Sequence, residues 1–411
     1  MTDREFTKIL DWPGYRVYRH EIDEAARTLK LWVRRKRGNG VLVCSGCGGR
    51  APKIVEVRER TVRDLPWRKY QAMVLVEFYR VRCPGWGLKV EEVPQLPGKA
   101  PFSRDFEAAV GLACEAGSAR QVARQFGLSA STVRAIDLRY LERWAAARKK
   151  PALARLGVDE IYLGKKQKFI TVVSNLDTAE PLWFGRERKK ETLDEFFSSE
   201  LSRGQRMRIT AACIDMWVPF RQSIGQWAPN CRIVYDKFHI MQHANRAIDE
   251  VRRAEFFRKG LKMRGLVKGK RWLLLTRWMN LSAVKRQELN QLFTLNRKLF
   301  KAYMLKESLD RLWSYKYERA MARYLQSWID QLRWQRLEPF QKLARTLLDH
   351  IDGILNYCRT KVPLGVVEAV NGNIKALIRR GRGYKDLRYL LLKAQRMAAA
   401  KTEFVVFRKA A

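Results

Sequence analysis

Five short apolar or alternating runs between residues 155 and 238 constrain the fold more than any other feature. They are "RLGVDEIYL", "KFITVVSNL", "PLWFGRE", "RMRITAACIDM" and "CRIVYDKF". Runs of this length and period are typical of β-strands, whereas "ETLDEFFSSELS" and "VPFRQSIGQW", which lie between the later runs, have helical spacing. Three closely spaced strands followed by a helix, a strand, a helix and a strand predict a mixed α/β sheet.

On either side of these runs, the apolar residues recur with a different spacing. Residues 15–35 predict two strands, and "KYQAMVLVEFYRVRCPGWGLKV" predicts another, so a small β module is expected near the start of the chain. The proline-rich stretch 94–103 predicts a linker, and residues 104–149 have helical spacing. From about residue 240 to residue 350 only helical patterns occur.

Residues 118–138, "SARQVARQFGLSASTVRAIDL", have the pattern of a helix-turn-helix. Ala123 lies where two helices approach closely, Gly127 lies at the turn, and Ser129 and Ser131 are possible caps of the second helix. The beginning of such a helix enters the DNA major groove, so the candidate contacts are Ala130, Ser131, Thr132 and Arg134. An ordinary helical hairpin is the alternative.

Cys44 and Cys47 have the C-x-x-C spacing that lets two thiolates bind one zinc ion. The second pair is incomplete, because Cys83 is followed at the fourth position by Trp86. A structural zinc site is normally closed by four ligands. One interpretation is a zinc ion that takes His20 or water as its fourth ligand. The alternative is a cysteine knuckle that has lost its metal and packs the Trp86 ring in the space that zinc occupied.

Acidic residues lie at or near the ends of two strand runs: Asp159, with Glu160 beside it, and Asp215. Buried carboxylates need a cation or hydrogen-bond donors, and Mg²⁺ accepts one or two protein carboxylates. If Glu368 from "LGVVEAVNGNIKALIRR" faces the same place, three carboxylates would hold two divalent ions across a scissile phosphate. Spacing alone leaves open that these acids are ordinary salt-bridge partners.

The formal net charge of +40 over 411 residues indicates a polyanionic partner, with nucleic acid the first candidate and a ribosome-associated protein the alternative. No apolar run is long enough to span a bilayer, and no signal core follows the start, so the sequence predicts a soluble cytoplasmic protein without a membrane partner. Seven scattered cysteines indicate reduced thiols.

Four ordered blocks resemble those of the ISL3 family of bacterial insertion-sequence transposases: "LGVDEIYLGKKQKFITVVSNLDT", "CIDMWVPF", "VYDKFHIMQHANRAIDEVRR" and "LGVVEAVNGNIKALIRRGRGYKDLRYL". The cysteine module and "SARQVARQFGLSASTVRAI" occur in the same order in that family, so the resemblance covers nearly the whole chain. It implies a ribonuclease-H-like catalytic domain with a D-D-E triad, interrupted by an all-helical insertion.

Carried onto this sequence, the triad is Asp159, Asp215 and Glu368, which would bind two Mg²⁺ ions, with Mn²⁺ able to substitute. Glu160 competes for the first position but would point to the opposite side of its strand.

Asp236 and His239 in "DKFH" resemble the D-x-x-H signature of transposases with helical insertions. His239 would then support the active site and contact phosphate; a purely structural histidine is the alternative.

The resemblance and the charge pattern together predict the DNA contacts. The candidate residues are Ser131, Thr132, Arg134, Lys375, Arg379, Arg380 and Arg382. The basic segment 258–271 is a further candidate. Most of the tryptophans in the helical part are expected in its core, with a minority available to stack on DNA bases; they are Trp272, Trp278, Trp313, Trp328 and Trp334.

The expected fold class is multidomain, combining α+β and α/β parts. A zinc-ribbon-like module would cover residues 1–97 and a helix-turn-helix domain residues 98–150. The ribonuclease-H-like domain would begin over 151–240, be interrupted by an all-helical insertion over 241–350, and end over 351–411.

The expected function is that of a DNA transposase that binds terminal inverted repeats, cleaves double-stranded DNA with Mg²⁺ and joins the ends to target DNA. Two ends must be joined, so a homodimer is expected in the active complex, acting on nucleoid DNA. The alternatives are a sequence-specific DNA-binding regulator without catalysis and a structure-selective nuclease of the same fold.

Overall fold

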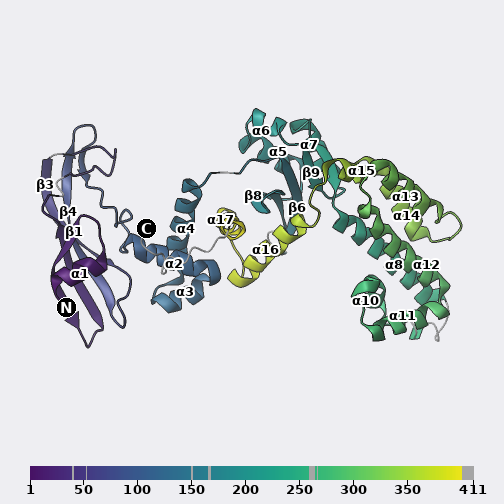
Figure 1. Ribbon diagram of the computed structural model, residues 1–411, viewed down its shortest axis with the longest axis horizontal. Helices are drawn as coiled ribbons and strands as arrows, with labels where there is room; N and C mark the ends of the chain where they lie inside the picture. The colour runs from purple at the N-terminus through teal and green to yellow at the C-terminus, as the bar shows by residue number, and fades with distance from the viewer. Residues whose placement is uncertain are drawn as a thin grey trace. The chain divides into compact units, whose positions relative to one another are not determined.

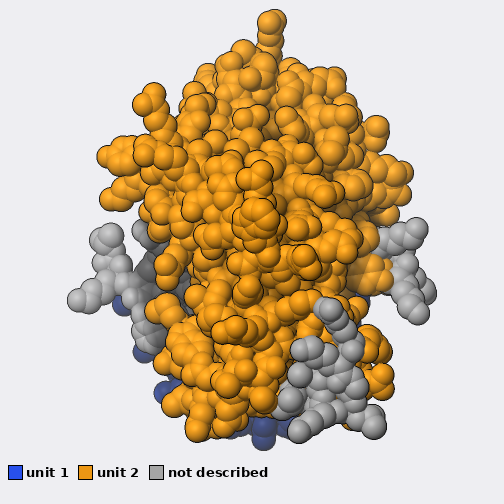
Figure 2. All heavy atoms as spheres, turned by 90° about the vertical axis from the view of Figure 1, so that its right-hand side faces the viewer, with its two compact units in different colours: residues 1–148 blue, residues 149–411 orange. Residues whose placement is uncertain are grey.

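The computed structural model contains two compact units, Met1–Arg148 and Lys149–Ala411, which Figure 2 colours separately and which are described one at a time (Figures 1 and 2). The described residues are 1–38, 41–51, 53–149, 151–164, 168–258, 264–265 and 267–399. None of the helices in these ranges combines the length and the apolar character that a membrane crossing requires.

The first unit begins with a helix and a five-stranded sheet in the order β1-β2-β4-β3, with β5 paired to β4. The pairs are antiparallel except β2–β4. Alternate residues of β1, β2 and β4 point into a core that includes Phe6, Val33 and Val76. The elements are α1 (Asp3–Leu10), β1 (Tyr15–Asp23), β2 (Thr28–Arg35), β3 (Lys53–Arg63), β4 (Gln71–Cys83) and β5 (Gly87–Val90).

The two strands predicted over residues 15–35 and the strand that runs into Cys83 are confirmed as β1, β2 and β4. β3 and α1 were not predicted. β3 reads "KIVEVRERTVR", and residues 53–59 are exposed on both faces of the sheet, so charged residues interrupt the apolar alternation that would identify a strand.

The irregular segment 94–103 is bound to β3 rather than extending freely as a linker. The Arg63 N–H donates to the carbonyl of Pro101 at 2.9 Å, and the Ser103 N–H donates to the carbonyl of Arg63 at 2.9 Å. The Arg60 guanidinium also donates to the carbonyls of Gly98 and Ala100. These bonds tie the segment to the sheet within the first unit.

Three helices follow this segment: α2 (Arg104–Ala116), α3 (Ala119–Phe126) and α4 (Ala130–Ala147). Their shared core contains Phe106, Val110, Val122, Val133 and Ile136. Apolar residues at three-to-four spacing predicted helices over this range, and the helices pack through those residues.

The second unit contains a five-stranded mixed sheet in the order β10-β9-β6-β7-β8. β6, β7 and β8 pair antiparallel, whereas β9 and β10 run parallel to β6. All five strands that the apolar runs predicted are present. They are β6 (Arg155–Gly164), β7 (Lys168–Asn175), β8 (Glu180–Arg186), β9 (Ala211–Ile214) and β10 (Arg232–Tyr235).

Helices cover both faces of this sheet. On one face, α16 (Val366–Gly381) and α17 (Leu387–Ala398) pack on β6, β7 and β8 through residues such as Ile161 and Val370. On the other face, α5 (Lys190–Ser199) and α7 (Val218–Trp227) share a core with Val158. The short helix α6 (Arg203–Met207) precedes β9.

A helical section separates β10 from α16 (Figure 1). Its described residues contain helices only, as the sequence predicted. Its elements are α8 (Lys237–Arg258), α10 (Arg271–Leu275), η1 (Trp278–Asn280), α11 (Ala283–Leu295), α12 (Arg297–Asp310), η2 (Arg311–Ser314), α13 (Glu318–Asp330), α14 (Glu338–Asp349) and α15 (Ile351–Thr360). Much of the basic segment 258–271, namely 259–263 and 266, lies outside the described residues.

Of the tryptophans in this section, Trp313 and Trp328 are buried, as expected for core residues, and Trp278 is packed against the same core. Trp272 and Trp334 are instead exposed. Three of the five tryptophans therefore pack in the core, as expected for most of them; helical spacing alone does not show which of the five lie at the helix surface.

The substitution Gly157→Ala tests how closely α16 approaches β6. A Cβ atom on Gly157 would lie 2.6 Å from Ser174 Oγ and 2.9 Å from Val367 Cγ2. We expect the change to lower the free energy of unfolding by about 1–3 kcal/mol, as overpacking does. Urea unfolding monitored by circular dichroism measures the effect.

Gly225→Ala in α7 is the matched control, because nothing lies within 4 Å of its added Cβ. An alanine inside a helix is favoured over glycine by roughly 0.5–1 kcal/mol, so this variant should be at least as stable as the natural protein. Equal unfolding midpoints for the two variants would contradict the close approach.

Candidate functional site

Three acidic residues lie level with one another on three neighbouring parallel strands: Asp159 in the middle of β6, not at its end as the sequence suggested, and Asp215 and Asp236 directly after β9 and β10. In the register of β6 and β9, Gly157 pairs with Cys213, so Asp159 and Asp215 lie two residues beyond this pair on their respective strands. Asp236 directly follows β10, which is in register with β9 up to the residue before the acid. Parallel register therefore brings the three acids to one edge of the sheet.

Asp159 is bound from two helices that begin far along the chain. The Asn371 side-chain N–H of α16 donates to Asp159 Oδ2 at 2.7 Å, and His239 Nε2 of α8 lies 3.5 Å from Asp159 Oδ1. Burial opposes the charge on His239, but the hydrogen bond and charge of Asp159, with those of the neighbouring acids, outweigh it and raise the pKa of His239. Protonated His239 is therefore stabilised at this edge.

Glu368 lies in the first turn of α16 and is exposed. It precedes Asn371 by three residues, so the two side chains lie on neighbouring positions of one helix face. Burial raises the pKa of Asp236, and the charges of Asp159 and Glu368 contribute to that increase. The structure thus brings Glu368 to the same region as the strand acids.

The acids are adjacent but do not form a closed set of ligands. In the part of the chain that the structure describes, only a cysteine group brings its potential ligand atoms within 4.8 Å of one another. The negative charges are partly balanced by protein cations, of which His239 is one.

Arg188 is the second of these cations and was not predicted from the sequence. Its Nε lies 2.8 Å from Glu160 Oε1, and its guanidinium also pairs with Asp215. Burial and the charge of Asp215 raise the pKa of Glu160 to about 7, although Arg188 acts in the opposite direction. Glu160 lies on the opposite face of β6 from Asp159, yet it reaches the site through Arg188.

The basic residues predicted to contact DNA after Glu368 are all exposed. Lys375 lies one turn beyond Asn371 on α16, Arg379 and Arg380 lie in the last turn, and Arg382 is the C-cap. The helix dipole favours cations at this end. α16 therefore carries an acid in its first turn and positive charge along its remaining length.

The predicted helix-turn-helix is formed by α3 and α4. Gly127 between them has φ of 61°, a conformation that glycine adopts without a steric penalty. Ser129 Oγ accepts a hydrogen bond from the Thr132 N–H at 3.1 Å and so caps α4. Ser131 and Arg134 are exposed, whereas Thr132 is half-buried and its hydroxyl is bonded to Ser129 at 2.8 Å.

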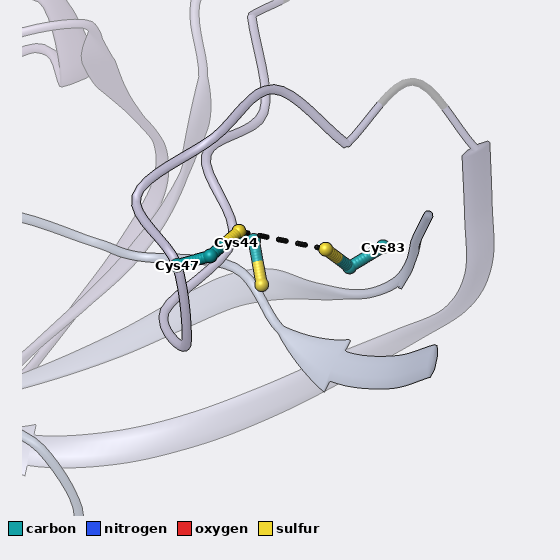
Figure 3. Close-up of side chains that lie close together, drawn as sticks. All are labelled: Cys44, Cys47 and Cys83. Carbon is teal, nitrogen blue, oxygen red and sulfur yellow. Dashed lines mark hydrogen bonds between the residues drawn. The ribbon is translucent and has the colours of Figure 1, made fainter. Parts of the chain in front are cut away.

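Cys44, Cys47 and Cys83 converge as the sequence predicted (Figure 3). The sulfur atoms of Cys47 and Cys83 are 3.5 Å apart, shown by the dashed line in Figure 3. The Gly46 N–H donates to Cys44 Sγ at 3.4 Å, and such backbone donors lower the pKa of the Cys44 thiol. The three thiols suit Zn²⁺, which prefers sulfur ligands.

Neither His20 nor Trp86 occupies the place beside the three cysteines that the sequence suggested for it. His20 bonds to Asp3, with Nδ1 2.6 Å from Oδ1, and is not part of the cysteine group, so its proposed role as a ligand is wrong. Trp86 is 58% exposed, and its ring covers Gly46, where an added Cβ would lie 3.6 Å from it. The ring therefore covers the knuckle from outside instead of packing among the sulfurs.

Comparison with known protein families gives three matches along the chain. A family described as "zinc-finger of transposase IS204/IS1001/IS1096/IS1165" matches residues 41–85, and "Helix-turn-helix domain of transposase family ISL3" matches residues 91–141. A family described as "Transposase" matches residues 156–394, more than half of the chain.

Two similar proteins extend this result over almost the full length. The chain is 31% identical over 399 residues to a transposase for insertion sequence element IS1001 from Bordetella parapertussis, covering 96% of this chain and 98% of that protein. It is 26% identical over 403 residues to a transposase for insertion sequence element IS1557 from Mycobacterium tuberculosis, covering 90% of this chain and 89% of that protein.

Replacing Trp86 with cysteine should complete the sulfur group. A fourth thiolate closes a tetrahedral zinc site, so we expect Trp86→Cys to retain zinc at chelator concentrations that remove it from the natural protein. Zinc per chain, measured by elemental analysis across a chelator titration, gives the comparison. Trp86→Ser, which removes the ring without adding a thiolate, should release zinc as readily as the natural protein; equal retention by both variants would contradict the prediction.

Removing the side-chain charge of Arg134 should weaken DNA binding. Arg134 is exposed near the start of α4, and each lost phosphate contact lowers the slope of log affinity against log salt by about 1. Fluorescence anisotropy at several salt concentrations measures this slope. Lys8→Ala in α1 removes the same charge away from α4 and should leave the slope unchanged; identical slopes for the two variants would place Arg134 outside the interface.

Proposed function

The chain belongs to the ISL3 family of insertion-sequence transposases, and from this membership we propose that it is the DNA transposase of such an element. It would bind the terminal inverted repeats, cleave the DNA strands at the element ends and join the freed 3′ hydroxyls to target DNA on the bacterial nucleoid. The observation that supports this proposal is that the register of β6 and β9 sets Asp159 level with Asp215, while α16, the helix that carries Glu368, is bonded to Asp159 through Asn371.

The catalytic domain is proposed to have a ribonuclease-H-like fold. Three antiparallel strands followed by two parallel strands, in the order β10-β9-β6-β7-β8, support this assignment. Asp159 lies on the central strand and Asp215 follows the next strand, the arrangement that a paired-carboxylate site of this fold requires. The helical section between β10 and α16 would be the insertion between the second aspartate and the glutamate.

Asp159, Asp215 and Glu368 would hold two Mg²⁺ ions, for which Mn²⁺ can substitute. Carboxylate oxygens are the ligands that these ions prefer, and the pKa of buried Asp215 is raised by burial, as expected for an acid that needs a compensating cation. When bound, such a metal pair supplies an activated hydroxyl and stabilises the leaving oxygen.

The chain's own residues would orient the acids and the DNA. Asn371 holds the Asp159 carboxylate by a hydrogen bond, Arg188 holds Asp215 by an ion pair, and His239 lies beside Asp159 with a raised pKa, able to contact a phosphate oxygen. The exposed cations of α16 would bind the DNA backbone next to Glu368.

DNA recognition would use the first unit. We assign residues 1–97 to a zinc-ribbon-like module and 98–150 to the helix-turn-helix domain, with Ser131, Thr132 and Arg134 at the DNA. The catalytic domain would comprise 151–240 and 351–411, with the insertion over 241–350. Because two element ends must be joined, the active complex would contain a homodimer.

The decisive experiment compares cleavage by the natural protein, Asp215→Ala and Glu368→Gln. The substrate is a labelled duplex carrying the inverted repeat that flanks the gene. Glu368→Gln nearly preserves side-chain size and lies on the exposed side of α16, so we expect both variants to bind the duplex normally and to lose Mg²⁺-dependent cutting, at least about 100-fold. Gel analysis measures the cutting, and anisotropy measures the binding.

Asp177→Asn, which removes an acid in the turn after β7 that is paired with Arg155, is the control and should cut at the natural rate. Normal binding without cutting by the natural protein would indicate a DNA-binding regulator. Cutting of branched DNA without preference for the repeat would indicate a structure-selective nuclease.

A further inference from the structure

Two exposed aromatic rings lie at equivalent positions beside the acidic site. Trp217 follows Asp215 by two residues, and Phe238 follows Asp236 by two residues. β9 and β10 are in register, and each ring belongs to the third residue beyond the end of its strand. Neither residue was predicted from the sequence, because a single aromatic residue after a strand carries no distinctive pattern.

The backbone of each aromatic residue is fixed by its acid. The Trp217 N–H donates to Asp215 Oδ1 at 3.0 Å, and the Phe238 N–H donates to Asp236 Oδ1 at 3.1 Å. The backbone from which each ring extends is therefore bonded to the neighbouring acid.

The rings are not part of the core. Trp217 is 38% exposed and Phe238 is 40% exposed, whereas Phe220 and Ile240, close to them in sequence, are fully buried. Exposing two large aromatic rings at such short distance from a charged site leaves apolar surface in water without a folding benefit. Each ring therefore keeps part of its surface free for a ligand.

Each ring also contacts a cation of the acidic site. The Arg188 guanidinium lies 4.4 Å from the centroid of the Trp217 ring and pairs with Asp215. His239 contacts Phe238, with ring centroids 5.7 Å apart, and lies beside Asp159. Flat apolar faces bordered by positive groups match a nucleotide, whose base stacks on aromatic rings and whose phosphate binds cations.

We propose that Trp217 and Phe238 form a stacking site for an unpaired nucleobase next to the phosphate that is cut. A base inside a duplex is already stacked on its neighbours, so only a base that has left the helix can use these rings. The inference rests on the proposed transposase function and extends it: the residues hold a displaced nucleotide, and their role is positioning rather than proton or metal chemistry.

The test is a double-mutant cycle between the protein and its DNA. Trp217→Ala and Phe238→Ala are compared with the natural full-length protein on the terminal-repeat duplex, in EDTA, by anisotropy. On intact DNA we expect each variant to lose about tenfold in affinity, within the range for one base–aromatic stack. A set of duplexes, each with one abasic nucleotide near the cleavage position, then locates the base.

At one abasic position the difference between the natural protein and the alanine variants should disappear, because the base that stacks on the rings is no longer present. Trp217→Phe and Phe238→Tyr keep an aromatic face and should bind intact DNA nearly as the natural protein does. Tyr317→Ala removes an exposed ring from the helical section and should leave the affinity unchanged at every position.

The stacking site would be overturned if the alanine variants lost the same affinity for intact DNA and for every abasic duplex. It would also be overturned if both variants bound DNA with the affinity of the natural protein. These binding measurements, made in EDTA, do not depend on DNA cleavage. Absence of Mg²⁺-dependent cleavage by the natural protein would therefore refute the proposed function separately, whereas cleavage at the natural rate by the double variant Trp217→Ala, Phe238→Ala would refute only the stacking site.

Discussion

The hydrogen bond from Asn371 to Asp159 connects parts of the chain that are 212 residues apart. It ties α16, the helix that carries Glu368, to the strand that carries Asp159. β6 begins the second sheet, whereas α16 comes after the whole helical section. Gly157 allows the helix to approach the strand closely, and apolar contacts such as those of Ile161 with the α16–α17 cluster hold the helix along the strand. This packing fixes α16, the helix that carries Glu368, on the strand that carries Asp159.

Concentrating acids at one edge is costly unless opposite charges or donors compensate for burial and repulsion. Here the compensation comes from every side of the edge: Arg188 after β8, His239 from α8 and Asn371 from α16. The same groups can interact with phosphates. An acidic site on a strongly basic protein is consistent with this arrangement, because the cations that stabilise the acids also attract the polyanion that the acids would act on.

Much of the fold was predictable, because the spacing of apolar residues and the ends of strands are local signals in the sequence. The five strands of the second sheet, the helix-turn-helix and the three-cysteine group followed from spacing, and the family suggested by four ordered blocks is confirmed by the comparisons. β3 was missed because charged residues interrupt its apolar alternation and residues 53–59 are exposed on both faces. Arg188 was missed because a basic residue carries little information in a chain with +40 net charge, and His20 was wrongly considered as a ligand because sequence does not reveal that Asp3 binds it.

The helical section leaves the second sheet and returns to it at the same strand. It starts directly after β10, and its last helix, α15, packs back on β10, where Gly353 lies against the Tyr235 ring and the Asn356 side chain donates to the Ile233 carbonyl at 3.0 Å. A segment whose two ends are anchored side by side is topologically an extended loop, and lengthening a loop changes its closure entropy only slowly. The helical section can therefore diverge in size and surface among related proteins while the geometry of the acidic edge is preserved.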